Sequence, residues 1–517
     1  MSAFLAQVAI PRDDLLDQID WFALSPEITL LIVGVILTVL DIVLLEKGRA
    51  ITPAVAGLGL LAPLVPIIML ANAGITDAPR MALGPAYIVD GYSLALKALF
   101  LLIGYLVVLM STNYIAEGDY WESEYYGMLV SSILGMVIMT SARDLITVFV
   151  ALELLSIPAY LMATWRKRDL KSNEAGVKYY LNGVFATALM LYGMSLLFGI
   201  SGSTILADIN TAITNEGPAS QAMIGLGIVL VIVGFGFKVS AVPFHLWAPD
   251  TYEGAPTPVA AFLAVGAKTA GFVALMNLVF VGFFDRSDFY APALWVLAAL
   301  TMTVGNLTAL RQNNLVRLLA YSGVAQAGFM LAPLAVAGRV VDGEGIAQTS
   351  VSSVVTYLII YAIMNLGAFA IVITVARRTG SGHIDSFNGL FQWSPGLAGA
   401  MTVFLASLAG IPPLGGWFAK FGVFRALLEA EVWWGVVLAA IAAVNTVIGF
   451  GYYGKLASRM WFEDAPEQFE TSRIKIPFAL MATLGITVVL TVASGVVPEI
   501  ITQFSDVDVP AGVADSR

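Results

Sequence analysis

The sequence predicts an all-α integral membrane protein of about fourteen transmembrane helices, in which two inverted five-helix repeats contain broken helices. Three observations indicate this class. Hydrophobic residues make up 59% of the 517 residues and charged residues only 12%, about half the charged fraction of a typical soluble domain. Apolar runs of roughly 20 residues, long enough to cross a hydrocarbon core of about 30 Å, recur throughout the chain. Two of these runs are interrupted by helix-breaking residues beside a lysine.

The apolar runs give the individual spans, and they are too long and uniform for an outer-membrane barrel. In chain order they lie near 28–45, 53–71, 92–112, 126–140, 144–163, 176–200, 222–244, 257–283, 291–310, 315–337, 350–376, 397–428, 432–454 and 477–502. The span at 126–140 is short and needs Tyr125 and its neighbours. We expect four regions: a three-helix segment at 1–125, a first repeat of spans 4–8 at 126–283, a second repeat of spans 9–13 at 291–456, and a cytoplasmic loop, final helix and tail at 457–517.

The composition excludes several kinds of site. The absence of cysteine excludes disulfides and iron–sulfur ligation within the chain. The two histidines, His245 and His383, lie near span ends, so we expect neither a bis-histidine haem nor a metal site. No phosphate loop, dinucleotide fingerprint or basic patch with interleaved aromatics occurs, so no nucleotide site and no nucleic-acid partner is expected. The first 27 residues lack the pattern of a cleaved signal peptide.

The basic residues predict the orientation. With both termini on the outer side of a bacterial cell membrane, the odd-numbered loops hold fourteen of the 26 Lys and Arg, and the even-numbered loops only four. The positive-inside rule therefore places the odd-numbered loops in the cytoplasm. Those fourteen residues are Lys47, Arg49, Arg166, Lys167, Arg168, Lys171, Arg311, Arg317, Arg377, Arg378, Lys455, Arg459, Arg473 and Lys475. The termini hold Arg12 and Arg517, so six basic residues remain inside spans: Lys97, Lys178, Lys238, Lys268, Lys420 and Arg425.

Two spans are interrupted beside a lysine. In GFGFKVSAVPFHLWAPD, Lys238 precedes Pro243 by five residues, and in LASLAGIPPLGGWFAKF, Pro412 and Pro413 precede Lys420. Proline removes a helical hydrogen bond and obstructs the preceding turn, so each helix should be unwound locally. Unwound backbone persists at membrane depth only inside protein or beside a hydrated cavity. These prolines are candidate gating residues.

His245, in the first interruption, is a further candidate gating residue, with a hydrogen-bonded structural role as the alternative.

The interrupted spans are the seventh and the twelfth. Because an offset of five is odd, the two cross the membrane in opposite directions, which is typical of inverted repeats whose discontinuous helices meet near the midplane. This arrangement places Lys238 and Lys420 at related positions. The alternative is that proline and glycine are simply common in membrane helices.

Several ionisable groups form a candidate relay. A charge at the bilayer centre costs roughly 2.5–3.5 kcal/mol, so such groups line wet or paired interior routes. Glu153 lies in an otherwise apolar span and Lys268 between small residues. We expect Glu153 to contact Lys238, and a lateral relay to continue through Lys178 and Lys268 to Lys420. The alternative for Lys178 is a local pair with Glu174, four residues before it.

Two further basic residues are expected to lie outside the relay. Lys97 should reach toward Asp90 at the outer end of its span. Arg425 should pair with Glu429.

Three stretches carry a resemblance. FKVSAVPFHLWAPDTYEGAPTPVAAFLAVGAKTAGF, LASLAGIPPLGGWFAKFGVF and the ALELLSIPAYLM around Glu153 closely resemble the antiporter-like membrane subunits of respiratory complex I. The resemblance covers spans 4 to 13. Lysine at 420 departs from the M-subunit pattern, and the lack of a long amphipathic helix after the last span departs from the L subunit.

The resemblance implies the function. The family's proton-channel residues fall on Glu153, Lys178, Lys238, Lys268 and Lys420. The chain would then be a proton-translocating subunit of an NADH:quinone oxidoreductase, driven by redox chemistry elsewhere. NADH, flavin, iron–sulfur clusters and quinone would bind to partner subunits, and this chain would hold no cofactor. Its partners would be other membrane subunits, including adjacent antiporter-like subunits, and the lipid bilayer.

Two readings stay open beside this one. A multisubunit cation/proton antiporter or a membrane-bound hydrogenase uses a similar fold, and sodium dependence or transport without NADH would favour it. The polar groups could also merely stabilise helix packing.

The second repeat departs from the first, since its span at YSGVAQAGFML has no counterpart to Glu153. A partner of Lys420 must therefore come from a different helix or an adjoining subunit.

Overall fold

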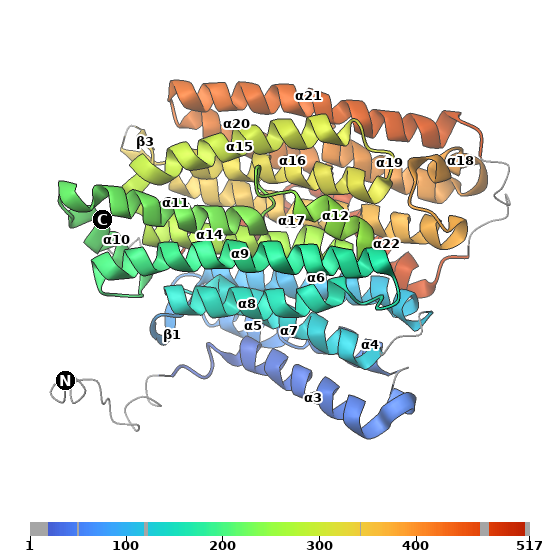
Figure 1. Ribbon diagram of the computed structural model, residues 1–517, viewed down its shortest axis with the longest axis horizontal. Helices are drawn as coiled ribbons and strands as arrows, with labels where there is room; N and C mark the ends of the chain where they lie inside the picture. Colours follow the sequence, from blue (N-terminus) through green and yellow to red (C-terminus); the bar gives the residue numbers. More distant parts are fainter. Residues whose placement is uncertain (1–18, 49–50, 118–121, 342, 466–474, 512–517) are drawn as a thin grey trace.

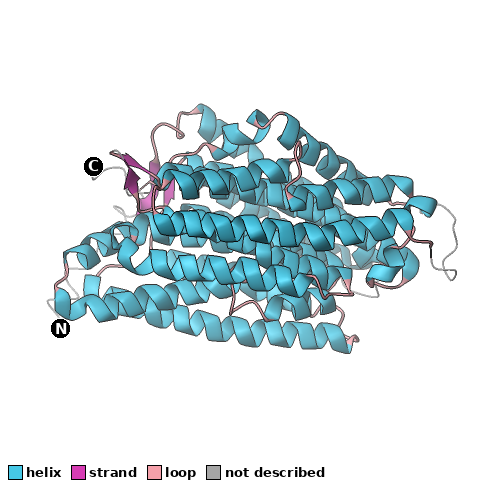
Figure 2. Ribbon diagram, turned by 90° about the horizontal axis from the view of Figure 1, so that it is seen from above, coloured by secondary structure: helices cyan, strands magenta, loops and turns pink. Residues whose placement is uncertain are grey.

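The computed structural model describes residues 19–48, 51–117, 122–341, 343–465 and 475–511. Its long helices lie side by side, and their axes are roughly aligned with one another (Figures 1 and 2). Twelve segments of the described chain are long and apolar enough to cross a membrane. Helix α7 and the pair α19 and α20 occupy the two other predicted spans. The count of fourteen, the repeats and the four regions stay predictions. Both termini, with Arg12 and Arg517, lie outside the described residues, as do Arg49 and Arg473 within the chain.

The helices before the first interruption follow the chain in simple order. They are α3 (Ser25–Gly48), α4 (Thr52–Leu61), α5 (Leu64–Asn72), α6 (Gly91–Ala116), α7 (Glu122–Ser141), α8 (Leu145–Ala163), α9 (Leu170–Ser201), α10 (Leu206–Asn215) and α11 (Gln221–Lys238). The predicted span at 53–71 is divided, because α4 ends at Leu61 and α5 begins after Pro63. A hairpin of β1 (Arg80–Pro85) and β2 (Ile88–Val89) joins α5 to α6.

The remaining helices include several short ones. They are α12 (Trp247–Gly254), α13 (Thr257–Phe262), α14 (Lys268–Asn277), α15 (Ser287–Ala309), α16 (Leu315–Val336), α17 (Ala347–Thr379), α18 (Leu390–Trp393), α19 (Pro395–Ala409), α20 (Gly415–Glu429), α21 (Trp433–Phe462), α22 (Phe478–Val496) and α23 (Glu499–Ser505). A second small hairpin, β3 (Val340–Val341) with β4 (Glu344–Gly345), lies between α16 and α17.

Polar caps fix the start of several helices. Asp90 forms a capping box with Ser93 at the start of α6. Asp144, Asp169 and Asn314 accept backbone N–H groups at the starts of α8, α9 and α16. Such a cap typically stabilises a helix by about 1 kcal/mol. The caps define where these helices begin, and therefore which side chains reach the interior.

Three elements form the centre of the bundle. In the most apolar 18-residue stretch of each span, 100% of the residues are buried in Thr257–Gly282 and 94% in α16 and in α17. The corresponding share is only 33% in each of the spans that contain α9, α15, α21 and α22. In Figure 1, α14, α16 and α17 lie between α9 on one side and α21 on the other. A charged side chain on the central elements is therefore enclosed by protein rather than by lipid.

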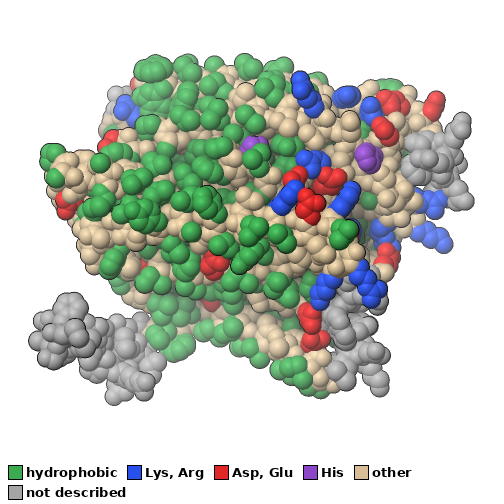
Figure 3. All heavy atoms as spheres, in the orientation of Figure 1, with side chains coloured by type: hydrophobic (Ala, Val, Ile, Leu, Met, Phe, Trp, Pro, Cys, Tyr) green, Lys and Arg blue, Asp and Glu red, His purple; other side chains and the backbone are tan. Residues whose placement is uncertain are grey.

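The two ends of the bundle differ in charge. The predicted cytoplasmic loops meet at one end, where an antiparallel β-bridge joins Asn314 to His383. The even-numbered loops meet at the other end, where a second β-bridge joins Tyr87 to Ala142. On the face shown in Figure 3, most Lys and Arg gather with Asp and Glu toward one end of the helices, while hydrophobic side chains cover much of the remaining face. We call this the basic end. The structure thus groups the loops as predicted, while the side of the membrane on which each end lies stays a prediction.

Both predicted interruptions are present in the helices. Helix α11 ends at Lys238, and α12 begins at Trp247. Helix α19 ends at Ala409, and α20 begins at Gly415. The peptide bonds before Pro243 and Pro413 are cis. A third irregularity was not predicted: the π-helical turn η2 (Leu263–Ala267) directly precedes Lys268. Such turns are frequent at functional sites, but no composition or spacing identifies them beforehand.

Candidate functional site

Three lysines are enclosed in the bundle. The exposed fractions of Lys238, Lys268 and Lys420 are 3%, 1% and 4%. Each lies beside an irregular piece of helix, since Lys238 ends α11, Lys268 follows η2, and Lys420 lies in the second turn of α20. Each Nζ donates to a neutral oxygen, and among the described residues none has a carboxylate within ion-pair distance.

Lys238 is surrounded by hydroxyl groups and aromatic rings. Its Nζ donates to Ser156 Oγ at 2.7 Å and to the Tyr179 hydroxyl at 3.5 Å. The ammonium also lies 5.8 Å from the ring centroid of Tyr160 and 5.6 Å from that of Tyr179, the range of a cation–π interaction. Its aliphatic stem packs closely on Gly271 of α14, one turn after Lys268. Helices α8, α9, α11 and α14 therefore meet around this one side chain.

Lys268 and Lys420 both use backbone carbonyls. Lys268 Nζ donates to the carbonyl of Gly323 in α16 at 2.7 Å and lies 5.9 Å from the Tyr361 ring centroid. Lys420 Nζ donates to the carbonyl of Ala409 at 3.0 Å and lies 4.9 Å from the Phe329 ring centroid. Ala409 is the last residue of α19, so the interruption supplies the acceptor for Lys420.

A polar network in α16 lies between these two lysines. Gln326, one turn after Gly323, donates to the carbonyl of Leu408 at 3.1 Å and to the Tyr453 hydroxyl at 3.2 Å. Its carbonyl oxygen accepts from Tyr357, and Tyr453 shares a 2.5 Å hydrogen bond with Ser322. These residues were not singled out from the sequence, because a glutamine or tyrosine in an apolar span gives no charge signal. They connect the carbonyl that binds Lys268 to the turn that binds Lys420.

Glu153 and Lys178 lie at the edge of this arrangement. Glu153 is partly exposed and accepts from Thr187 of α9 at 3.1 Å. The expected contact with Lys238 is absent between these described residues, because Lys238 bonds Ser156, one turn further along α8. The side chain of Lys178 is 42% exposed and pairs with Glu174 at 2.7 Å, the alternative considered above, and also with Asp250 at 2.8 Å.

The expectation for Lys97 was wrong. Its side chain is fully buried, and its Nζ lies 2.6 Å from Glu27 of α3. The expected partner, Asp90, is engaged by Arg143 at 2.9 Å. Lys97 is on the first turns of α6 but faces α3, so the group turns inward instead of toward the surface. Tyr87 donates to the same Glu27 carboxylate at 2.6 Å. The expected pair of Arg425 with Glu429 is present at 2.7 Å.

A second correction concerns the relation between Lys238 and Lys420. Pro243 and Pro413 are each followed four residues later by a tryptophan. Aligned on these prolines, Lys238 lies five residues before the first, and Lys420 seven residues after the second. In this alignment, the residue at the position of Lys420 in the first interruption is Asp250. Lys238 thus lies in the helix before its interruption, and Lys420 lies in the helix after its own.

His245 lies within the first interruption. It is 6% exposed, and its ring centroid is 6.3 Å from that of Tyr321 in α16. The imidazole is thus placed between α12 and the helix that binds Lys268. Among the described residues, no group of three His, Asp or Glu side chains is arranged to hold a metal ion. The gating roles of His245, Pro243, Pro412 and Pro413 stay predictions.

Enclosed lysines beside interrupted helices define a class: membrane proteins that pass ions or protons through a helical bundle. The chain belongs to the NADH:quinone oxidoreductase/Mrp antiporter family, whose transmembrane model matches residues 142–446.

Relatives named NADH-quinone oxidoreductase subunit N cover nearly the whole chain. The relative from Trichlorobacter lovleyi is 36% identical over 485 residues, 93% of this chain and 95% of the relative. That from Desulforamulus reducens is 38% identical over 479 residues, 92% and 96% of the two chains. These relatives confirm the family resemblance and agree with the departures from the M and L patterns.

Solved structures agree with these relatives. A chain of respiratory complex I from Thermus thermophilus is 32% identical, has a TM-score of 0.75, and covers 93% of this chain and 100% of its own length. A chain of the Mrp complex from Dietzia has a TM-score of 0.81 over 96% of this chain and 98% of its own. At 20% identity, the second likeness shows a shared fold alone.

Proposed function

We propose that this chain is a proton-translocating membrane subunit of an NADH:quinone oxidoreductase, assembled with other membrane subunits in a bacterial cell membrane. The observation that carries the proposal is the line of enclosed lysines. Lys238, Lys268 and Lys420 are buried across the centre of the bundle, and polar groups of α14 and α16 lie between them. Redox chemistry, with NADH, flavin, iron–sulfur clusters and quinone, belongs to the partner subunits.

The chemistry available to these lysines is proton exchange. Each Nζ bonds a hydroxyl or carbonyl oxygen, which accepts from an ammonium and, more weakly, from a neutral amine. Losing a proton therefore breaks no ion pair and leaves no stranded carboxylate. Lys238 passes a proton toward Lys268, and Lys268 toward Lys420, through hydroxyl groups and water. Glu153, about one turn from Ser156 on α8, is the acid of the proposed relay on the helix that binds Lys238.

Lys238→Ala tests this proposal in vesicles that contain the assembled complex. We expect NADH-driven proton pumping to fall at least tenfold at equal amounts of complex, because the first enclosed carrier is removed. Arg425→Ala is the matched control. Arg425 is another of the six basic residues inside predicted spans, but its pair with Glu429 is exposed. We expect the control to pump within twofold of the unchanged complex.

The same vesicles distinguish the other functions. Normal pumping by Lys238→Ala would contradict a carrier role for this lysine. Pumping that requires sodium, or transport without NADH, would assign the chain to a cation/proton antiporter assembly instead. If Lys420→Ala lowers the amount of complex but leaves pumping per complex intact, Lys420 acts in packing alone.

A further inference from the structure

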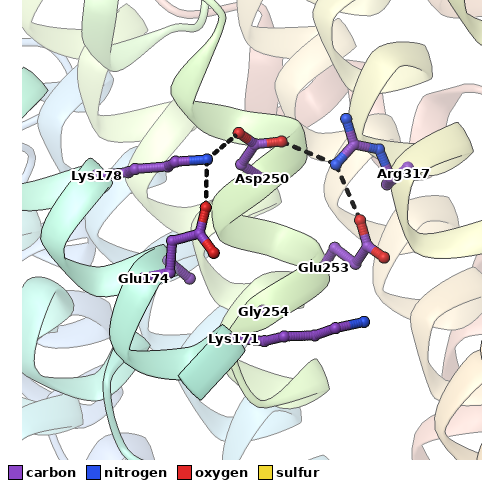
Figure 4. A pocket seen from close by; sticks show the side chains of 8 residues that line it. Lys171, Glu174, Lys178, Asp250, Glu253, Gly254 and Arg317 are labelled. Carbon is purple, nitrogen blue, oxygen red and sulfur yellow. Dashed lines mark hydrogen bonds and ion pairs between the residues drawn. The ribbon is translucent and has the colours of Figure 1, made fainter. Parts of the chain in front are cut away.

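A charged cluster outside the lysine line opens at the surface of the bundle. It comprises Glu174 and Lys178 of α9, Asp250 and Glu253 of α12, and Arg317 of α16, and we call it the Asp250 cluster (Figure 4). The cluster surrounds a cavity of about 140 Å³. It lies toward the basic end, where α9, α12 and α16 begin or end. Three elements from both predicted repeats thus meet at one polar opening.

Asp250 is the shared member of this cluster. Its Oδ2 lies 2.8 Å from Lys178 Nζ, and its Oδ1 lies 2.8 Å from Arg317 Nη1. Each cation also has a second carboxylate: Lys178 pairs with Glu174 at 2.7 Å, and Arg317 with Glu253 at 2.9 Å. Removing one member of an ion pair is costly mainly when a charge is left without a partner. Here, Asp250 can be neutralised while both cations keep a carboxylate.

A wall of aromatic rings separates the Asp250 cluster from Lys238. Tyr179, the residue after Lys178, stacks on Trp247, three residues before Asp250, with ring centroids 4.4 Å apart. Phe237 lies 5.0 Å from Trp247 and completes the wall. The Tyr179 hydroxyl is 3.5 Å from Lys238 Nζ on the inner side. The same two helices, α9 and α12, therefore carry both the ion pair outside and the ring stack inside.

We propose that Asp250 is the group that takes up protons for this chain at the basic end, and that Lys178 and Arg317 position it while the Tyr179–Trp247 stack separates it from Lys238. A proton binds first to a carboxylate oxygen of Asp250. It then moves to Lys238 Nζ in its amine form, past the Tyr179 hydroxyl, and Asp250 becomes a carboxylate again. This inference rests on the proposed function and names the route by which protons reach it.

The charges around Asp250 determine when it binds a proton. Lys178, Glu174 and Lys171 face the cavity from α9, Arg317 from α16, and Glu253 from its own helix. Burial would raise the pKa of Asp250, but the hydrogen bonds from Lys178 and Arg317 outweigh burial and hold that pKa below its usual range. Asp250 is therefore a carboxylate while both cations contact it, and it accepts a proton when one of them moves away and keeps only its other carboxylate.

Asp250→Asn tests this assignment in vesicles that contain the complex, because the amide keeps the shape but carries no proton. We expect pumping per assembled complex to fall at least fivefold, and Asp250→Glu to retain at least half of it. Asp385→Asn is the matched control, since Asp385 is an exposed acid that pairs with Arg459 at 2.6 Å at the same end. It should pump within twofold of the unchanged complex.

Arg317→Gln tests the positioning role through the pH profile. Loss of this cation raises the pKa of Asp250, so Asp250 binds protons at higher pH. The alkaline fall in pumping should therefore move to higher pH, whereas Arg317→Lys should restore the original profile. A purely structural role of Arg317 would lower the amount of complex without moving the profile.

Two outcomes overturn the inference while leaving the proposed function intact. The first is normal pumping by Asp250→Asn in a preparation where Lys238→Ala abolishes pumping. The second is a loss in Asp250→Asn that is confined to the amount of assembled complex. Normal pumping by both variants would instead contradict the proposed function.

Discussion

The enclosed lysines are held by neutral oxygens and aromatic rings. Lys268 and Lys420 bind backbone carbonyls, and Lys238 binds a serine hydroxyl. A ring face attracts an ammonium without donating or accepting a proton. This environment solvates the charged form partly and the neutral form well. A proton carrier needs both forms to be accessible, and an ion pair with a fixed carboxylate would favour only one of them.

Lys97 shows the opposite arrangement and carries a prediction. Its ammonium and the Glu27 carboxylate form a buried pair that ties α3 to α6. Removing one partner of such a pair typically costs about 3–5 kcal/mol, because the other charge is left buried alone. We expect Lys97→Met to lower the thermal stability of the purified complex, measured as the temperature at which this subunit is lost.

The double variant Lys97→Met with Glu27→Gln is the control for that prediction. It removes both charges, so it should regain most of the stability lost in Lys97→Met. Equal losses in the single and the double variant would show that the stem of Lys97, rather than its charge, holds the two helices together.

The sequence locates these residues better than it pairs them. A lysine in an apolar run is visible at once, so Lys238, Lys268 and Lys420 were found as candidates. The acceptors of Lys268 and Lys420 were not found, because they are backbone carbonyls of Gly323 and Ala409, and every residue carries such a group. Lys97 was misassigned for a related reason, since the nearest acid in the chain, Asp90, was closer than its true partner on another helix.

At the scale of elements, irregular helices determine where the lysines lie. The two proline interruptions were predictable because proline has a known local effect. The π-turn before Lys268 was not, because no residue type marks it. The division of the second span at Pro63 has the same local cause as the two interruptions, but it was not predicted. Helix α16 contacts three separate parts of the site. Its Gly323 carbonyl binds Lys268, its Arg317 binds Asp250, and its Gln326 binds the Leu408 carbonyl.

The second interruption depends on close packing against α22. A Cβ added at Gly495 would lie 2.0 Å from the carbonyl oxygen of Pro413, whereas one at Gly485 of the same helix would meet nothing within 4 Å. We expect Gly495→Ala to displace the turn that supplies the acceptor for Lys420, and to lower pumping severalfold at equal amounts of complex. Gly485→Ala should leave pumping unchanged. Normal pumping by Gly495→Ala would show that the turn tolerates displacement.

At the scale of the whole molecule, the apolar runs predicted an all-helical membrane protein because a bilayer demands backbone hydrogen bonds within each segment. The same runs could not indicate which helices are central. The central position of α16 and α17 depends on contacts between segments far apart in the chain, and both spans read from the sequence as apolar in the same way as the rim helices. The central helices are where the network around Gln326 was missed.

The orientation of the bundle in the membrane carries the last prediction. The chain has no cysteine, so one engineered cysteine is its only thiol. Lys167 is exposed in the loop before α9 at the basic end, and Glu216 is exposed after α10 at the opposite end. Because basic loops stay on the cytoplasmic side, a membrane-impermeant maleimide should label Glu216→Cys in intact cells but Lys167→Cys only after permeabilisation. The reverse labelling would show that the bundle has the opposite orientation in the membrane. The Asp250 cluster would then lie on the side to which protons are released.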